Sequence, residues 1–445
     1  MAKRKIKITE PAVPDTRWAA YAAIDWADKK NVWRLLPAGS QTAEPGEMEN
    51  TPEAVEEWAM ELHRRFEGRP VAVCLEQKRG QLVYMLTKYS HLVLRIAHPN
   101  TAAAYRETFA PSGAKDDGND TASLLDLLLR HPDQLRPLMP DTEETRLIQF
   151  LSQERRRLVD LRTGEGHRLK ASLKLYFPQI LQWFDDLASP LVGELLERWP
   201  TLEQLQRVNP AKLRKFFNEH NCRNQEKIDQ RIQQIYAAIP ATTDQAVIRA
   251  AGIVTRGQLA LIDTLRSQIG DLEKQLAQLE AEHPDSRIFR SFPGSGDALT
   301  PRLIAAFGTQ RDRYQNAAEL QCFSGIAPIT RASGQSRQVY FRWAAPKFLR
   351  QTFHEFAECS IPHSEWARTY YRYLRDQKKK GHHAAVRALA YKWIRILFRC
   401  WKDGTLYDER IHLRALRQHA APLSATGTDP TKPQWTRTAG FHKLI

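Results

Sequence analysis

Four acidic side chains stand where they could share metal ions. Asp25 and Glu76 each end a short apolar run, and Asp117 and Asp120 lie three residues apart at a predicted helix start, on one helical face. Carboxylates gathered in a fold repel each other unless cations lie among them. Two divalent ions about 4 Å apart meet that need and serve phosphoryl transfer. Ligands that are all oxygen favour Mg²⁺, or Mn²⁺ in its place.

Each of these acids also has a purely structural interpretation. An aspartate at the end of a strand, such as Asp25, is often a turn residue. The acidic run at residues 116–120 is typical of a helix N-terminus, where the helix dipole favours negative charge. The spacing of the four acids does not by itself exclude this alternative.

The elements that would position the acids alternate between strands and helices. Residues 18–25 and 70–76 are predicted to be buried strands, because each is a nearly continuous apolar run. The predicted order is strand, strand, an optional third strand, helix, strand, helix, strand and helix. The other predicted elements are a hairpin strand at 31–36, helices from Thr51 and Leu82, a strand at 91–97 and a helix from Asp117. This order indicates an α/β domain of about 130 residues.

The middle of the chain is predicted to be mostly helical. From Ile262 to Leu279, apolar residues recur at alternating steps of three and four, which gives a heptad seam of about three repeats (Ile262, Leu265, Ile269, Leu272, Leu276 and Leu279). Such a seam favours a coiled coil that pairs subunits. The alternative is a long helix that packs inside one subunit.

The C-terminal third is strongly basic. The whole chain has a formal charge of +15, and residues 284–445 alone hold 27 lysines and arginines against 12 acidic residues. With aromatic residues interleaved among the charges, this composition is typical of nucleic-acid binding. Lys378, Lys379 and Lys380 are expected to contact the phosphate backbone, although a merely soluble basic surface is the alternative.

Other compositional features exclude some functions. No run of about 18 uncharged apolar residues is present, so no membrane span is expected. The basic N-terminus is not followed by an apolar stretch, so a secretory signal is not expected. Five scattered cysteines favour reduced thiols in a cytoplasm over a zinc site.

Several short motifs resemble one family when they are taken in order. They are Tyr21-Ala-Ala-Ile-Asp25, Leu75-Glu76, Lys115-Asp-Asp117-Gly-Asn-Asp120, Phe292-Pro-Gly-Ser-Gly296, Phe323-Ser-Gly-Ile-Ala-Pro328 and Ala332-Ser333-Gly334. Their order and separation resemble the DEDD-type insertion-sequence transposases, a group that includes the Piv/MooV-like invertases and the bridge-RNA-guided recombinases. The resemblance covers roughly residues 18–130 and 285–405.

The resemblance implies a concrete mechanism. Asp25, Glu76, Asp117 and Asp120 would be the metal-binding tetrad of an RNase H/RuvC-like domain, and Ser333 would attack DNA to form a covalent phosphoserine. Ser336, three residues on, stays open as the nucleophile instead. Basic residues around this serine would contact phosphates: Arg331, Arg337, Arg342 and Lys347.

The resemblance also implies partners and a location. The partners would be DNA, a structured non-coding guide RNA and further copies of the chain in a dimer or tetramer. The location would be the nucleoid of a prokaryotic cytoplasm. Two other functions stay open: a RuvC-like nuclease or junction resolvase without covalent serine chemistry, and a non-catalytic nucleic-acid-binding protein. The sequence leaves undetermined the DNA sites, the identity of any guide RNA, and the choice among insertion, excision and inversion.

Four domains are expected in total. They are a metal-binding α/β domain, a helical linker with the coiled-coil segment, a mostly α-helical basic transposase domain that carries the serine, and a tail (residues 1–142, 143–283, 284–420 and 421–445).

Overall fold

The computed structural model describes residues 17–77, 79–109, 117–132, 135–334, 336–411 and 413–414. The chain divides into two compact units, Met1–Pro140 and Asp141–Ile445. This division, after Pro140, lies close to the domain boundary that the sequence predicts after residue 142. The boundaries predicted at 283 and 420 stay predictions, and the tail at 421–445 lies outside the described residues.

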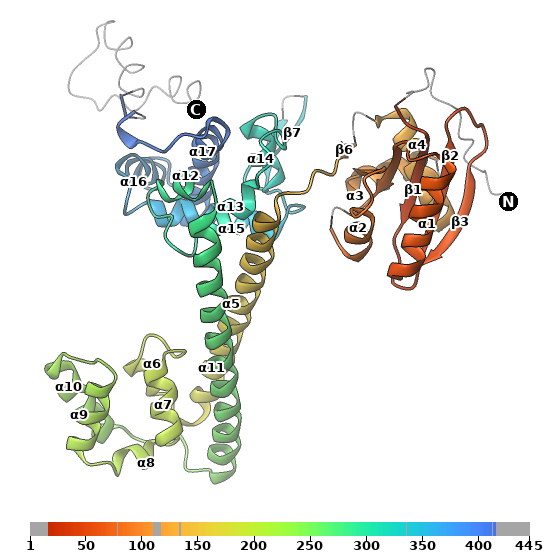
Figure 1. Cartoon of the computed structure of the whole chain (residues 1–445). Coiled ribbons are helices and arrows are strands. Elements are labelled where there is room, and N and C mark those ends of the chain that lie inside the picture. Colours follow the sequence, from red (N-terminus) through yellow and green to blue (C-terminus); the bar gives the residue numbers. More distant parts are fainter. Residues whose placement is uncertain are drawn as a thin grey trace, which may run out of the picture. The chain divides into compact units, whose positions relative to one another are not determined.

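The first unit is built on a six-stranded mixed sheet in the order β3-β2-β1-β4-β5-β6 (Figure 1). Strands β1, β4 and β5 are parallel, whereas β2, β3 and β6 join their neighbours antiparallel. The strands are β1 (Ala20–Asp25), β2 (Lys30–Pro37), β3 (Glu44–Glu49), β4 (Val71–Leu75), β5 (Leu92–Ile96) and β6 (Arg136–Pro137). The helices are α1 (Pro52–Arg65), α2 (Gln81–Leu86), α3 (Pro99–Phe109) and α4 (Asp117–Arg130).

Helices cover both faces of this sheet, which explains why β1 and β4 are apolar throughout. On one face, Ile24 and Leu75 pack in a core with α1 and α2. On the other face, Ala23 and Cys74 pack in a second core with α4. The predicted α/β domain is therefore present.

The local signals for α1 hold in detail. Thr51 is the N-cap residue, and its hydroxyl accepts a hydrogen bond from the Ala54 amide at 3.3 Å. Pro52 occupies the first helical turn, where its missing N–H costs nothing. Helix α3 was not part of the predicted order, because its alanine-rich sequence carries no apolar stripe of helical period.

The second unit begins with two long helices that run side by side, α5 (Glu143–Tyr176) and α11 (Gln245–Glu282) (Figure 1). They are antiparallel, since Ile148 near the start of α5 shares a core with Leu276 near the end of α11. Five short helices form a separate core where α5 ends and α11 begins. These are α6 (Ile180–Trp183), α7 (Pro190–Arg198), α8 (Leu202–Gln206), α9 (Pro210–Glu219) and α10 (Gln225–Ala237).

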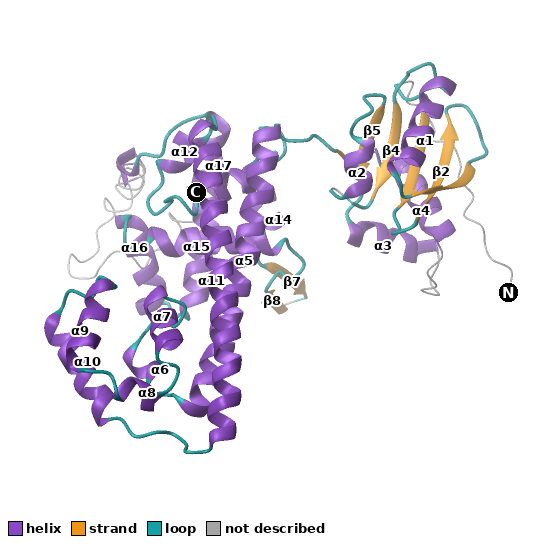
Figure 2. Ribbon diagram, turned by 60° about the horizontal axis from the view of Figure 1, so that its bottom comes forward, coloured by secondary structure: helices purple, strands orange, loops and turns teal. Residues whose placement is uncertain are grey.

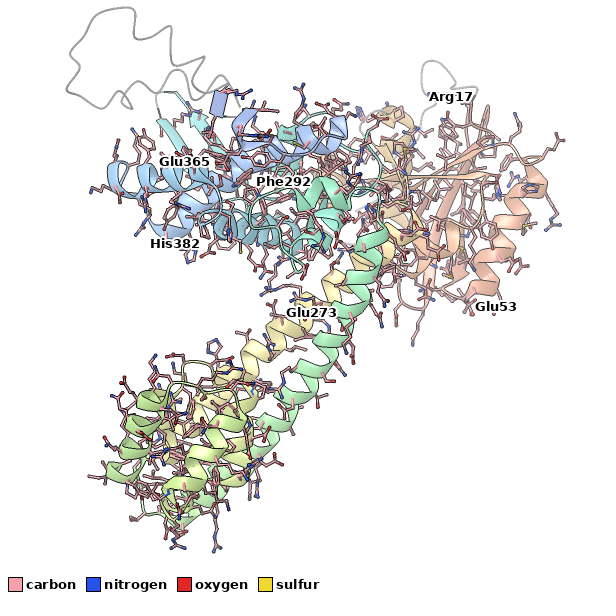
Figure 3. All side chains as sticks on the ribbon, turned by 60° about the vertical axis from the view of Figure 1, so that its left-hand side comes forward. Arg17, Glu53, Glu273, Phe292, Glu365 and His382 are labelled. Atoms are coloured by element: carbon pink, nitrogen blue, oxygen red, sulfur yellow. The ribbon has the colours of Figure 1, made fainter. Side chains whose placement is uncertain are left out.

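The heptad seam of α11 packs against α5 of the same chain. Ile262, Ile269 and Leu276, which are seven residues apart, are buried there. Arg155 on α5 donates from Nε to Glu273 on α11 at 2.9 Å, and Figure 3 labels Glu273 on the stretch of α11 between the two helical cores. The seam therefore serves the alternative of packing inside one subunit. Leu265, Leu272 and Leu279 of the seam are only half-buried, and the interpretation that the seam also pairs subunits stays a prediction.

The remaining elements form the helical body that follows α11 (Figure 2). They are α12 (Ser286–Arg290), α13 (Thr300–Phe307), α14 (Ala317–Phe323), β7 (Ile329–Ser333), β8 (Ser336–Tyr340), α15 (Lys347–Ser360), α16 (Glu365–Arg372), a π-helical turn (Tyr373–Gln377) and α17 (His382–Asp403). Trp393 and Trp401 of α17 are fully buried in its core, whereas Trp343 is 79% exposed. Among the described residues, no helix is long and apolar enough to cross a membrane.

Gly294 lies in the predicted tight turn before α13, where the chain approaches the end of α15. Its φ of 81° is in the left-handed region, and an added Cβ would lie 2.5 Å from the carbonyl oxygen of Cys359. We expect Gly294→Ala to destabilise the second unit by about 1–3 kcal/mol, because both the backbone strain and the contact are unfavourable. Thermal unfolding measures this. Gly296→Ala, which meets nothing within 4 Å, is the control, and equal unfolding midpoints for the two variants would contradict the expectation.

Candidate active site

Asp25 and Glu76 lie at the same end of two neighbouring strands. Strands β1 and β4 are parallel, with Ala23 opposite Cys74 in the register. Because side chains alternate across a strand, residues two positions apart share a face. Asp25 and Glu76 each follow a residue of the α4-facing core by two positions, so the pleat directs both carboxylates to the side of the sheet that α4 covers.

The negative charge of Glu76 shifts the pKa values of two side chains, Cys74 and Arg106. Burial and, after it, the Glu76 carboxylate raise the pKa of the Cys74 thiol to about 12. The same carboxylate contributes to raising the pKa of Arg106 on α3. These effects agree with the direction that the pleat predicts for Glu76.

Asp120 is in the first turns of α4 and is only 5% exposed. Its Oδ2 accepts a hydrogen bond from Nη1 of Arg106 at 2.8 Å. Its Oδ1 is buried and has no hydrogen-bond partner among the residues that the structure describes. A buried carboxylate oxygen without a partner is costly in a folded protein and is typical of a site that binds an ion.

Asp117 is the first residue of α4, one turn before Asp120, and its side chain lies outside the described residues. Among the described side chains, no group of three or more histidines, cysteines, aspartates or glutamates could hold one ion. Arg106 interacts with both Asp120 and Glu76, and the strand register puts Asp25 beside the end of β4 that Glu76 follows. The single metal pocket with all four acids stays a prediction.

Arg106 is the residue of this site that sequence reasoning missed. Its pKa is raised first by its hydrogen bond to Asp120, and the Asp120 and Glu76 charges raise it further. Arg106 therefore supplies positive charge among the acids. It lies on α3, the helix without an apolar stripe, so no periodic signal pointed to it.

Ser333 and Ser336 lie on an exposed hairpin of the second unit, formed by β7 and β8 (Figure 2). The two serines face each other as a cross-strand pair. Residues of one strand share a face when they are two apart, so Arg331 lies on the face that carries both serines. Arg337 pairs with Ala332 and lies on the opposite face.

The other residues predicted to contact phosphates differ in the interactions that they form within the chain. Arg342 donates from Nε to the Ala327 carbonyl oxygen at 3.3 Å. Lys347 forms an ion pair with Asp160 on α5 at 3.1 Å. Lys378 lies over the ring of Tyr373 at 5.7 Å, and Lys379 and Lys380 follow it, all three exposed, in the loop before α17. The basic residues predicted from sequence thus belong to two surfaces, the hairpin with its base and the loop before α17.

An α/β unit with carboxylates at neighbouring strand ends, joined to a basic helical unit, is typical of the class of enzymes that act on nucleic acids. A transposase model for the DEDD type of IS110 matches residues 22–178, and the model of the IS116/IS110/IS902 transposase family matches residues 286–372. The chain belongs to this family of DEDD-type insertion-sequence transposases. Its activity is therefore DNA transposition, and DNA is its partner.

Two relatives come from Streptomyces coelicolor. The first is the "Mini-circle putative transposase for IS117", which is 29% identical over 364 residues, or 81% of this chain and 87% of the relative. The second is the "Insertion element IS110 uncharacterized 43.6 kDa protein", which is 26% identical over 306 residues, or 68% of this chain and 74% of the relative.

Proposed function

We propose that the chain is a recombinase that cleaves and rejoins DNA by combining an RNase H/RuvC-like metal site with a serine nucleophile. The observation that carries the proposal is Asp120, which pairs with Arg106 beside Glu76 and has one buried oxygen without a partner among the described residues, while the strand register puts Asp25 at the same end of the sheet as Glu76. Three antiparallel strands that continue into parallel β4 and β5 support the RNase H/RuvC-like fold.

The acids fit a magnesium ion in their chemistry. Asp25, Glu76, Asp117 and Asp120 would be its ligands, with oxygen as the only donor atom, and Mn²⁺ fits the same set. When bound, the divalent metal stabilises negative charge on the oxygens of the reacting phosphate. Asp120 would turn its unpaired Oδ1 toward the ion, while Arg106 holds Oδ2.

Ser333 would act on the scissile phosphate from the hairpin. Its hydroxyl oxygen forms a bond to phosphorus, and the bond from phosphorus to one sugar oxygen breaks. The serine proton is lost to solvent, and the released sugar oxygen takes up a proton. Rejoining reverses these steps with a different sugar hydroxyl. Since an ordinary serine hydroxyl is a weak nucleophile, it needs activation by a metal or a base.

Arg331 is expected to hold the phosphate that Ser333 attacks, because both side chains lie on one face of the hairpin. We expect Arg331→Ala to lower strand exchange by about tenfold or more, since a guanidinium stabilises charge that develops on phosphate oxygens. Arg337→Ala, on the opposite face, is the matched control and should cost far less. Rates of strand exchange measured for both variants test this, and a larger loss for Arg337→Ala would contradict it.

A covalent adduct is the direct test of the proposal. The full chain is incubated with Mg²⁺ and labelled DNA that carries the ends of its genetic element, with and without RNA transcribed from the flanking DNA. We expect a DNA–protein adduct that protease removes, and mass spectrometry should find the nucleotide on a peptide that contains Ser333. Cleavage without any adduct would favour the water-attacking nuclease. DNA binding without cleavage would favour the non-catalytic protein.

The remaining partners belong to the same proposal. A guide RNA is proposed to select the DNA sites, and the omission of RNA in the adduct assay tests it. A dimer or tetramer is proposed because exposed apolar side chains on α5, such as Leu161 and Leu175, offer a surface beyond the buried part of the seam. Light scattering on the full chain measures the assembly. A nucleoid location in the cytoplasm is proposed from the DNA substrate.

A further inference from the structure

Two arginines meet over one aromatic ring at the base of the serine hairpin. Phe341 directly follows β8. The guanidinium carbon of Arg387 on α17 lies 4.3 Å from the centroid of this ring, and that of Arg350 on α15 lies 5.1 Å from it. Arg350 lies nine residues after Phe341, whereas Arg387 comes from a helix further along the chain, so no periodic pattern in the sequence could indicate that the three meet.

The positive charge at this point is not neutralised. In the part of the chain that the structure describes, neither Arg350 nor Arg387 forms an ion pair with a carboxylate. The nearby acids of α15 serve other partners: Glu355 pairs with Arg156 and Arg302, and Glu358 with His382. Burial and, after it, the Arg350 charge lower the pKa of Arg387. Two like charges in a partly buried place are unfavourable unless an anion joins them.

Both guanidinium groups keep donors available. Arg350 uses Nη1 for the carbonyl oxygens of Arg342 and Trp343, each at 3.3 Å. The guanidinium of Arg387 donates to none of the described residues, and its buried Nε has no partner. A planar guanidinium with free N–H groups matches the oxygens of a phosphate in pairs.

We propose that Arg350 and Arg387 form a phosphate clamp that holds one phosphodiester group of the DNA strand beside the hairpin. This inference rests on the proposed function, and DNA is chosen because the same hairpin carries Ser333. Trp343 lies 4.6 Å from the Phe341 ring between centroids and is 79% exposed, so it offers a surface on which a neighbouring base can stack. The clamp would fix the strand relative to the serine.

The salt dependence of DNA binding tests the clamp. Anisotropy of a short labelled DNA duplex is measured over a salt series with the full chain, Arg350→Gln and Arg387→Gln. We expect each variant to bind about tenfold more weakly, with a slope of log K against log salt that is shallower by about 1. Arg249→Gln removes the same charge from an exposed position on α11 and should keep the wild-type slope. Wild-type affinity and slope in both clamp variants would overturn the proposal.

A second measurement uses the unaltered chain and so does not depend on how the variants fold. Phenylglyoxal modifies accessible arginines, and mass spectrometry locates the products. We expect bound DNA to protect Arg350 and Arg387 but not Arg249, and equal modification with and without DNA would overturn the clamp. If the Arg350→Gln and Arg387→Gln variants lose affinity only for RNA of the same sequence and not for DNA, the choice of DNA is overturned. If the wild-type chain binds DNA but both variants do so equally well, the clamp alone fails. If the wild-type chain binds no DNA, the proposed function fails with it.

Discussion

Ser333→Ala is expected to lower DNA strand exchange by at least about a thousandfold while DNA binding is unchanged. The reason is that the proposed reaction passes through a covalent bond to the Ser333 hydroxyl, which alanine lacks. Ser333 is exposed on a hairpin strand, so the loss of its hydroxyl should alter folding stability by no more than about 0.5 kcal/mol. The measurement is the yield of exchanged strands over time, together with the yield of protease-sensitive adduct.

Ser336→Ala is the matched control for this result. Ser336 is the cross-strand partner of Ser333, lies on the same face of the hairpin and is also exposed. We expect Ser336→Ala to keep most of the exchange activity. If Ser336→Ala instead abolishes adduct formation and Ser333→Ala does not, the nucleophile has been assigned to the wrong serine. If neither change matters, covalent serine chemistry is absent.

Asp120→Asn is expected to lower metal-dependent cleavage by at least about a hundredfold and to remove the thermal stabilisation that Mg²⁺ gives the wild-type chain. The change removes a charge and replaces one acceptor oxygen by an amide that donates. A ligand that binds only the folded state stabilises it by RT ln(1 + [L]/Kd), which is about 2.7 kcal/mol at a hundredfold excess over Kd. Unfolding midpoints over a MgCl₂ series measure this independently of cleavage.

Asp126→Asn separates metal binding from structural damage. Asp126 lies on the same helix and is only 1% exposed. It accepts hydrogen bonds from the Tyr105 hydroxyl at 2.7 Å and from Nε of Arg130 at 2.9 Å. Like Asp120→Asn, Asp126→Asn should lower the free energy of unfolding, because hydrogen-bond partners are lost. Unlike Asp120→Asn, it should leave the stabilisation by Mg²⁺ intact. A full Mg²⁺ response in Asp120→Asn, or the loss of that response in Asp126→Asn, would place the ion elsewhere.

Local sequence determined the secondary structure of this protein well where the periodic signal was strong. The apolar run that ends at Asp25 forms β1, and the run before Glu76 forms β4. Helix α1 begins at Pro52, directly after its N-cap residue Thr51, as the sequence predicts. The charge of the C-terminal third and the order of the motifs pointed to the family, because composition and short motifs do not depend on packing. Helix α3 was missed because alanine-rich helices carry no apolar stripe.

Only the tertiary structure decided which surfaces are free and which side chains meet. The heptad seam of α11 is chemically suited to another subunit or to α5, and the return of the chain through α6–α10 brings α5 within reach first. Arg106 among the acids, and Arg350 with Arg387 over Phe341, are contacts between distant segments. Sequence spacing specifies the face of an element, but the partner of that face depends on how the whole chain packs, and that is why these residues were found only in the fold.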